Sequence, residues 1–276
     1  MTNIVINHKS GACVKIALNG ATVISWKLPN GREQLYLSKK NTFENGSAIR
    51  GGIPVVFPQF SNEGPLKKHG FARNSQWNCV DTSYDDVRDV ATATLALSDN
   101  EETRKEWNYK FQLHYIVELS NSSLTTKLVI ENTDDKPFDF QALLHTYYSI
   151  DNIDDIAITG FKGVERDDKV NHQVYTETHD QINFSSEYDS KYAHPPNDVE
   201  LIEKNQIRKI HKEFICDGQE IPSDFVVWNI FTRIASIGDM EPEDYKSYVC
   251  IEPGYVMKHF TLPANKICSL SQTIHA

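Results

Sequence analysis

The chain has 276 residues, of which 39% are hydrophobic and 24% are charged, and its formal net charge is −10. Such a composition supplies enough apolar residues for a globular core, so it excludes intrinsic disorder. The acidic balance also argues against a nucleic-acid partner, because a protein that binds the phosphate backbone needs a basic face to displace counterions.

The N-terminal residues and the cysteines indicate the compartment. The N-terminus lacks the basic start and long apolar core of a secretory signal, and no apolar run reaches the 18 residues that a membrane helix needs. The five cysteines are odd in number, widely scattered and without a Cys-x-x-Cys pair, which indicates reduced thiols. We therefore expect a soluble, cytoplasmic protein with no metal site and no membrane partner.

Short alternating runs begin at the N-terminus and continue along the chain. Residues 12–28 form two such runs joined by Asn19 and Gly20, a strong hairpin signal. Residues 91–98, 109–120 and 124–132 continue the period of two. The second of these places five apolar side chains on one face: Phe111, Leu113, Tyr115, Val117 and Leu119. No window longer than about twelve residues shows an apolar stripe of helical period, so we predict an all-β fold.

Residues 161–201 are polar and rich in turn residues, and two interpretations remain open for them. They could link two domains, or they could be long functional loops within one domain. Strand-like fragments recur inside this segment, and alternation resumes in residues 207–215. We therefore predict one domain over residues 1–276.

The stretch RGGIPVVFPQF, residues 50–60, has an unusual concentration of glycine and proline. Gly51 and Gly52 let the main chain bend or approach another group without a Cβ clash. Pro54 and Pro58 donate no backbone hydrogen bond, which favours an edge strand or a bulged crossing. These residues together are expected to fix where Arg50 points.

A dense group of cations accompanies this stretch. Arg73 follows in KHGFAR, with Lys67 and Lys68 beside it, in a chain that is otherwise acidic. Two guanidinium groups match the oxygens of a phosphate or carboxylate, so Arg50 and Arg73 are candidates for binding an anionic substrate. The alternative is that both arginines are solvated or paired with surface carboxylates.

Two further residues could supply acid/base chemistry. His145 follows a strand pattern that places it on the same face as Leu143 and Tyr147, and Glu252 follows an apolar strand directly before Pro-Gly, where we expect the strand to end. A histidine and a carboxylate on separate strands form a plausible proton-transfer pair. The alternatives are a core histidine and a solvated glutamate. The sequence contains no nucleophile elbow, phosphate-binding glycine loop or zinc motif.

Five motifs occur in one order: IRGGIPVVFPQF (49–60), HGFAR (69–73), LLHTYYSI (143–150), VVWN (226–229) and YVCIEPG (248–254). In this order the chain resembles the glucose-6-phosphate 1-epimerases, or hexose-6-phosphate mutarotases, of the aldose 1-epimerase superfamily, over roughly residues 4–274. The resemblance implies a single large antiparallel β-supersandwich of the galactose mutarotase-like kind. It also implies a sugar cleft on one sheet face, with the polar middle as loops over it.

The resemblance also assigns roles to residues. His145 corresponds to the general acid and Glu252 to the general base, and Arg50 and Arg73 to the phosphate-binding arginines. Asp189 corresponds to a ligand of a sugar hydroxyl, and His69 lies beside the sugar in the superfamily. The chain departs from the family pattern at two places. Lys68 stands where Gln is usual and is carried over as a substrate-binding residue, and Ile230-Phe231 replaces Pro-Trp.

The activity implied is the interconversion of the α and β anomers of glucose 6-phosphate by ring opening and reclosure, without a cofactor. Because the reaction needs a protonated histidine, we expect nearby anions to raise the pKa of His145. We also expect a monomer. Two rival functions remain: an aldose 1-epimerase of unphosphorylated sugars such as galactose, and a non-catalytic sugar-phosphate binding protein. The range of hexose 6-phosphates remains open.

Overall fold

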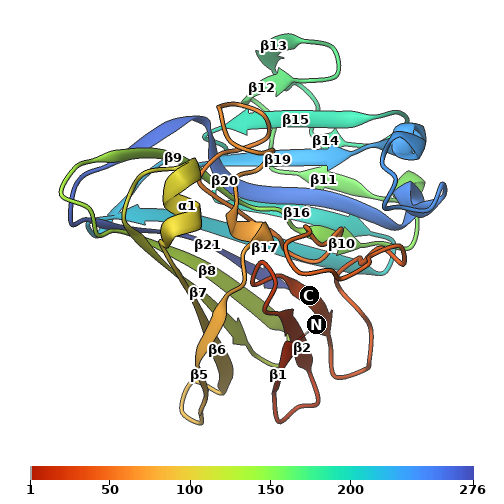
Figure 1. Cartoon of the computed structure of the whole chain (residues 1–276). Helices are drawn as coiled ribbons and strands as arrows, with labels where there is room; N and C mark the ends of the chain where they lie inside the picture. Colours follow the sequence, from red (N-terminus) through yellow and green to blue (C-terminus); the bar gives the residue numbers. More distant parts are fainter. Residues whose placement is uncertain (1) are drawn as a thin grey trace.

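The computed structural model describes residues 2–276, which form three antiparallel sheets (Figure 1). The smallest sheet contains three consecutive strands, β1 (Asn3–Asn7), β2 (Cys13–Ala17) and β3 (Val23–Lys27). The hairpin expected at Asn19 and Gly20 is confirmed, because β2 pairs with β3 around these residues. The all-β prediction is also confirmed: the one α-helix within the described range is the six-residue α1 (Glu101–Glu106). No helix there is long and apolar enough to cross a membrane.

The largest sheet has ten strands and contains the most regular alternation of the sequence. In β7 every second residue, from Phe111 to Leu119, is buried, as the pattern of the sequence predicts. The strands of this sheet are β5 (Asn78–Asp85), β6 (Val90–Ser98), β7 (Phe111–Leu119), β8 (Ser123–Asn132), β11 (Ala157–Thr159), β14 (Gln181–Ile182), β16 (Asp198–Glu203), β17 (Gln206–Cys216), β18 (Gln219–Glu220) and β21 (Ile267–His275).

The third sheet has eight strands and carries the candidate site. Its main order is β13-β12-β15-β19-β20-β9-β4, with β10 paired to β20. The strands are β4 (Val55–Val56), β9 (Phe138–Leu144), β10 (Tyr147–Ser149), β12 (Glu165–Asp168), β13 (Gln173–Thr176), β15 (Tyr188–Ala193), β19 (Asp224–Asn229) and β20 (Tyr248–Leu262). Four short 3-10 helices lie in the connections: η1 (Ala72–Asn74), η2 (Ile153–Asp155), η3 (Phe231–Ser236) and η4 (Asp244–Ser247).

One hydrophobic cluster joins the sheets. It contains Val14 of β2, Leu113 of β7 and Leu144 of β9, so all three sheets contribute to the same core. Side chains of successive strand residues point to opposite faces, so the neighbours of Leu144 along the chain lie on the far side of the eight-stranded sheet. Leu143 belongs to a separate small cluster on that far side.

The polar middle segment differs from the expectation. Much of it forms strands β12 to β16 of the two large sheets, instead of loops over a cleft. The charged residues of these strands make the strand pattern hard to recognise in the sequence. Arg166 and Asp168 of β12 pair with each other and are largely withdrawn from water. Ion pairing and hydrogen bonding therefore allow a polar sequence to enter a sheet that composition alone would not predict.

Candidate active site

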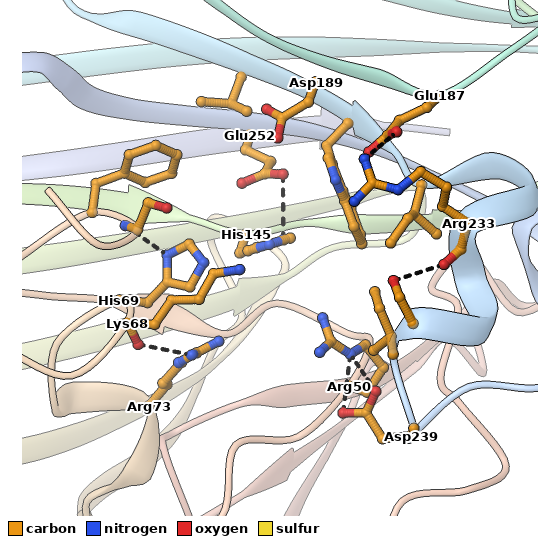
Figure 2. A pocket seen from close by; sticks show the side chains of 18 residues that line it. Arg50, Lys68, His69, Arg73, His145, Glu187, Asp189, Arg233, Asp239 and Glu252 are labelled. Atoms are coloured by element: carbon orange, nitrogen blue, oxygen red, sulfur yellow. Dashed lines mark hydrogen bonds and ion pairs between the residues drawn. The ribbon is translucent and has the colours of Figure 1, made fainter. Parts of the chain in front are cut away.

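A cleft of about 700 Å³ opens on the face of the eight-stranded sheet that points away from the core (Figure 2). All seven site residues expected from the sequence line it. Figure 2 shows Arg50 and Arg73 at one end and Glu252 and Asp189 at the other. The seven residues are Arg50, Lys68, His69, Arg73, His145, Asp189 and Glu252.

The glycines after Arg50 are required by close backbone contacts. Gly51 and Gly52 have φ values of +109° and +67°, which L side chains rarely adopt. A Cβ on Gly51 would lie 2.4 Å from the carbonyl oxygen of Tyr36, and one on Gly52 would lie 2.1 Å from that of Val23. Only glycine fits at both positions, and the backbone that results carries Arg50 to the rim of the cleft.

The prolines lie at a sheet edge, as the sequence indicates. Strand β4 is the last strand of the eight-stranded sheet and pairs only with β9 among the described strands. The carbonyl of Pro54 accepts from the backbone N–H of His145 at 3.0 Å, and that of Pro58 accepts from the N–H of Gln141 at 2.8 Å. At this edge the missing N–H groups of the two prolines cost no hydrogen bond within the sheet. The carbonyl of Pro54 also helps to position His145.

Arg50 is held at two of its nitrogen atoms. Its Nη1 donates to the hydroxyl of Tyr147 at 3.0 Å, and its Nε faces both carboxylate oxygens of Asp239 at 3.1 and 3.2 Å. Interactions with Tyr147 and then with Asp239 raise the pKa of Arg50 despite its burial. The sequence left open that Arg50 pairs with a carboxylate, and this alternative is correct. The pair with Asp239 lies in the lining of the cleft.

Arg73 and Lys68 are cations without a carboxylate partner in the described part of the chain. The Nη2 of Arg73 donates to the backbone carbonyl of Lys68 at 2.9 Å, and its buried Nε has no hydrogen-bond partner there. Burial, and the like charge of Arg50, lower the pKa of Arg73 to about 10, so it remains a cation at neutral pH. Burial and then the two arginines lower the pKa of Lys68.

Lys67 lies outside this group. Its Nζ is 3.5 Å from Glu106 of α1 and its side chain is exposed on another part of the surface. The expectation of two lysines beside the arginines is therefore wrong for Lys67, because neighbouring residues in an irregular segment point in different directions.

His145 and Glu252 form a buried pair. Nδ1 of His145 lies 3.4 Å from Oε1 of Glu252, and the two residues are 7% and 1% exposed. The His145 ring stacks on Tyr147 with 4.7 Å between centroids, and the ring of Trp228 meets it edge-on at 5.9 Å. Nδ1 of His145 and Oε2 of Glu252 have no hydrogen-bond partner within residues 2–276. Buried polar atoms without partners are costly, and hydroxyl groups of a bound ligand can satisfy them.

Glu252 does not end its strand, contrary to the expectation. Strand β20 continues through Pro253 and Gly254 to Leu262. On one side β20 pairs with β10 as far as Cys250 and with β9 again from Gly254, so the ladder is open between these two residues. The opening accommodates Pro253, which has no N–H to donate, and it brings His145 opposite Glu252.

The expectation that the pKa of His145 is raised is wrong, because its surroundings lower the pKa. Burial, and then the cations Arg50, Arg73 and Lys68, lower its pKa well below the ordinary value. Burial, and then the charge of Asp189, raise the pKa of Glu252 well above its ordinary value. Both shifts have one main cause, because a site withdrawn from water disfavours the charged form of either group. Both shifts favour a neutral pair, with a neutral imidazole and a protonated carboxyl group, in the ligand-free protein.

Asp189 and His69 complete the polar lining. Asp189 of β15 pairs in register with Trp228 of β19, and burial and then the charge of Glu187 raise the pKa of Asp189 to about 6. The backbone N–H of Ser61 donates to Nδ1 of His69 at 3.2 Å, and burial lowers the pKa of this imidazole. A neutral His69 with Nδ1 as acceptor carries its proton on Nε2, where it is a hydrogen-bond donor.

Only one group of possible metal ligands converges in the described residues. Ligand atoms of His145, Cys250 and Glu252 lie within 4.8 Å of one another and offer nitrogen, sulfur and oxygen. A cation held there would occupy the lone pairs that His145 and Glu252 need for proton transfer. Metal binding and acid/base chemistry therefore exclude each other at this position.

Several cleft residues were not predicted from the sequence. Trp228 lies in the VVWN motif, to which the sequence assigns no role, and no sequence signal points to Glu187, Arg233 or Asp239. No motif of the sequence includes the segment with Arg233 and Asp239. Its place beside Arg50 depends on a contact between residues almost 190 positions apart.

Comparison with known proteins identifies the family of this fold and cleft. Residues 2–275 match the family model described as aldose 1-epimerase. A Cenchrus ciliaris protein named "Putative glucose-6-phosphate 1-epimerase" is 34% identical over 95% of this chain and 80% of its own length. An Escherichia coli protein of the same name is 32% identical over 98% of this chain and 89% of its own.

Solved structures agree with the sequence relatives. A "putative mutarotase" from Salmonella typhimurium has a TM-score of 0.86 and 28% identity, covering 99% of this chain and 89% of that one. A galactose mutarotase related enzyme from Lactobacillus acidophilus has a TM-score of 0.78 at 18% identity, covering 99% and 97% of the two chains, and shows the fold alone. The galactose mutarotase-like supersandwich expected from the sequence is thus confirmed. This chain belongs to the aldose 1-epimerase family.

Proposed function

We propose that the protein interconverts the α and β anomers of glucose 6-phosphate, and of other hexose 6-phosphates that fit the cleft, as a cytoplasmic monomer. One observation carries the proposal: the pair His145–Glu252, in which each residue has a buried polar atom without a hydrogen-bond partner, shares a cleft with the guanidinium groups of Arg50 and Arg73. The pair supports anomer exchange and the arginines support a phosphate on the sugar. The names of the relatives from Cenchrus ciliaris and Escherichia coli support the same substrate.

The chemistry needs one proton shared by the pair. Glu252 removes the proton of the anomeric O1 hydroxyl while His145 protonates the ring oxygen O5, and the C1–O5 bond breaks. The aldehyde rotates about C1–C2 and the C5 hydroxyl closes on the other face, with the two roles reversed. This step needs imidazolium and carboxylate, so the proton held by Glu252 in the free protein must first pass to His145, 3.4 Å away.

A bound phosphate favours that transfer. The cations Arg50, Arg73 and Lys68 all lower the pKa of His145. A phosphate dianion held by these cations offsets their charge, so the pKa of His145 rises when the substrate binds. The phosphate then contributes to the chemical step as well as to affinity. We infer that Asp189 and His69, which also line the cleft, bind sugar hydroxyl groups.

The first test compares sugars. We expect exchange between the anomeric H1 signals of glucose 6-phosphate in NMR exchange spectra with catalytic amounts of protein, and far slower exchange of glucose and galactose. Exchange of the free sugars alone would identify an aldose 1-epimerase for unphosphorylated substrates. Stabilisation by glucose 6-phosphate in a thermal-shift assay without any exchange would identify a binding protein. Either of these results would reject the proposal.

The second test removes the arginines. A charge-assisted hydrogen bond from each arginine is worth about 1.5–3 kcal/mol, so two contribute about 3–6 kcal/mol, or roughly two to four orders of magnitude. We expect the double variant Arg50→Ala/Arg73→Ala to lose that much kcat/KM on glucose 6-phosphate and to keep its residual rate on glucose. Equal losses on both sugars would mean that the arginines support the fold.

A further inference from the structure

Two ion pairs hold one connecting segment at the rim of the cleft. The segment supplies the carboxylate of one pair and the guanidinium of the other. This segment, residues 230–247, joins β19 to β20 and contains η3 and η4. Asp239 of the segment pairs with Arg50 across 3.1 Å, and Arg233 of the segment pairs with Glu187 across 2.7 Å (Figure 2). The substrate-free cleft therefore carries two carboxylates that neutralise two of its cations.

The ion pair with Asp239 occupies the Nε side of the Arg50 guanidinium. Nε faces both oxygens of Asp239 and Nη1 donates to Tyr147, so Nη2 is the one nitrogen without a partner in the described chain. A guanidinium binds an oxyanion best through two parallel N–H groups. The edge formed by Nε and Nη2 can offer such a fork to phosphate only after Asp239 has moved away.

Asp239 can leave without disturbing the backbone. Its side chain is 43% exposed, so water can solvate the released carboxylate. Its carbonyl oxygen accepts from the hydroxyl of Ser38 at 2.6 Å, which ties the main chain in place. Asp244, five residues further on, accepts from the hydroxyl of Tyr36 at 2.6 Å and ties the segment a second time. A turn of one side chain is enough to open the fork.

We propose that Asp239 is an internal counter-ion that competes with the phosphate of the substrate for Arg50, and that it sets the affinity of the cleft for phosphorylated ligands. This inference deepens the proposed function and rests on it for the identity of the substrate. A carboxylate is a planar oxyanion like one face of a phosphate, so it stands in for the substrate in the free protein. It also repels the incoming dianion.

The test measures binding of inorganic phosphate, which needs no turnover. We expect Asp239→Asn to bind phosphate about five- to tenfold more tightly than the wild type by isothermal titration calorimetry at low salt, since one anion has been removed from a partly screened site. KM for glucose 6-phosphate falls by a similar factor. The gain shrinks as salt is added.

The matched control is Glu241→Gln. Glu241 lies two residues away in the same segment and pairs with Lys40 at 3.5 Å, so the substitution removes the same charge without freeing Arg50. We expect its phosphate affinity to stay within about twofold of the wild type, as for exposed pairs. A comparable gain in both variants would show a general charge effect and overturn the inference.

Unchanged or weaker phosphate binding by Asp239→Asn would also overturn it, and would assign Asp239 to the positioning of Arg50. That result is separable from failure of the proposed function, which is decided by exchange of glucose 6-phosphate with the wild-type protein. Active wild type together with no gain in the variant rejects only the role of Asp239.

Discussion

The two ends of the cleft are built in different ways. The proposed acid/base end consists of His145, at the junction of β9 and β10, and Glu252, on β20, in the middle of the eight-stranded sheet. The cation end, Arg50, Lys68 and Arg73, lies on irregular segments and on the short η1. Proton transfer needs fixed distances and exclusion of water, which paired strands provide. Recognition of a dianion needs charge that a ligand can reach, which loops provide.

The two ends are nevertheless coupled through their charges. Burial lowers the pKa of His145 and of Arg73 alike, but Arg73 remains a cation while His145 becomes neutral, because their ordinary values differ so much. The cation end then lowers the pKa of His145 further. The charges of an empty phosphate site therefore favour the neutral form of His145, and we expect a bound phosphate to relieve this effect.

The largest effect is expected from breaking the acid/base end. Glu252→Gln keeps the volume of the side chain and removes its basicity, so kcat falls by about 10²–10⁴-fold on glucose 6-phosphate and glucose alike. NMR exchange rates measure this loss, and a melting temperature at or above that of the wild type shows that the fold is intact. Selective loss on one sugar would contradict a role in the shared chemical step.

A matched variant removes another buried glutamate. Glu177 pairs with Arg166 outside the cleft and is 2% exposed. Glu177→Gln is expected to lower the melting temperature, because it weakens a buried ion pair, and to leave the exchange rate unchanged. Glu252→Gln is thus expected to lower the exchange rate but not the melting temperature, and Glu177→Gln to lower the melting temperature but not the exchange rate. This contrast separates a role in catalysis from a role in stability.

A smaller effect is expected from pH, and it tests the coupling. Because the pKa of His145 is lowered, the acid limb of kcat/KM lies below pH 6.5, with the rate falling about tenfold per pH unit. Because the pKa of Glu252 is raised, this carboxyl keeps its proton above its ordinary range, and the alkaline limb follows its ionisation. An infrared difference spectrum of wild type against Glu252→Gln at pH 7 should contain a protonated carboxyl band. A carboxylate band in the free protein would reject the assignment.

The smallest effect is expected from Lys68→Gln, which introduces the glutamine that the resemblance leads us to expect at this position. Burial and the arginines lower the pKa of Lys68, and its charge is the outermost addition to the cation end. We expect KM for glucose 6-phosphate to rise by about two- to fivefold, as for a partly screened charge, with kcat little changed. A loss of kcat as large as that of Glu252→Gln would place Lys68 in the chemical step.

The sequence predicted the fold class and seven of the residues that line the cleft. Alternation in β7 and β8 defined the core face directly, because the side-chain period of a strand is two. The motifs around Arg50, Arg73, His145 and Glu252 identified candidate residues because each combines a functional side chain with backbone-shaping glycine or proline, or with a strand. Local patterns carry this information without any long-range contact.

Other features depended on tertiary structure. The continuation of β20 past Glu252 follows from an opening in its ladder, and the strands of the polar middle follow from buried ion pairs. The neutral form of His145 follows from burial beside three cations drawn from distant segments. The sequence alone thus determined which side chains are available and which face of each strand is apolar. Only the tertiary structure decided how much water and which charges surround those side chains, because the electric field at a buried group is the sum over neighbours that the chain order does not reveal.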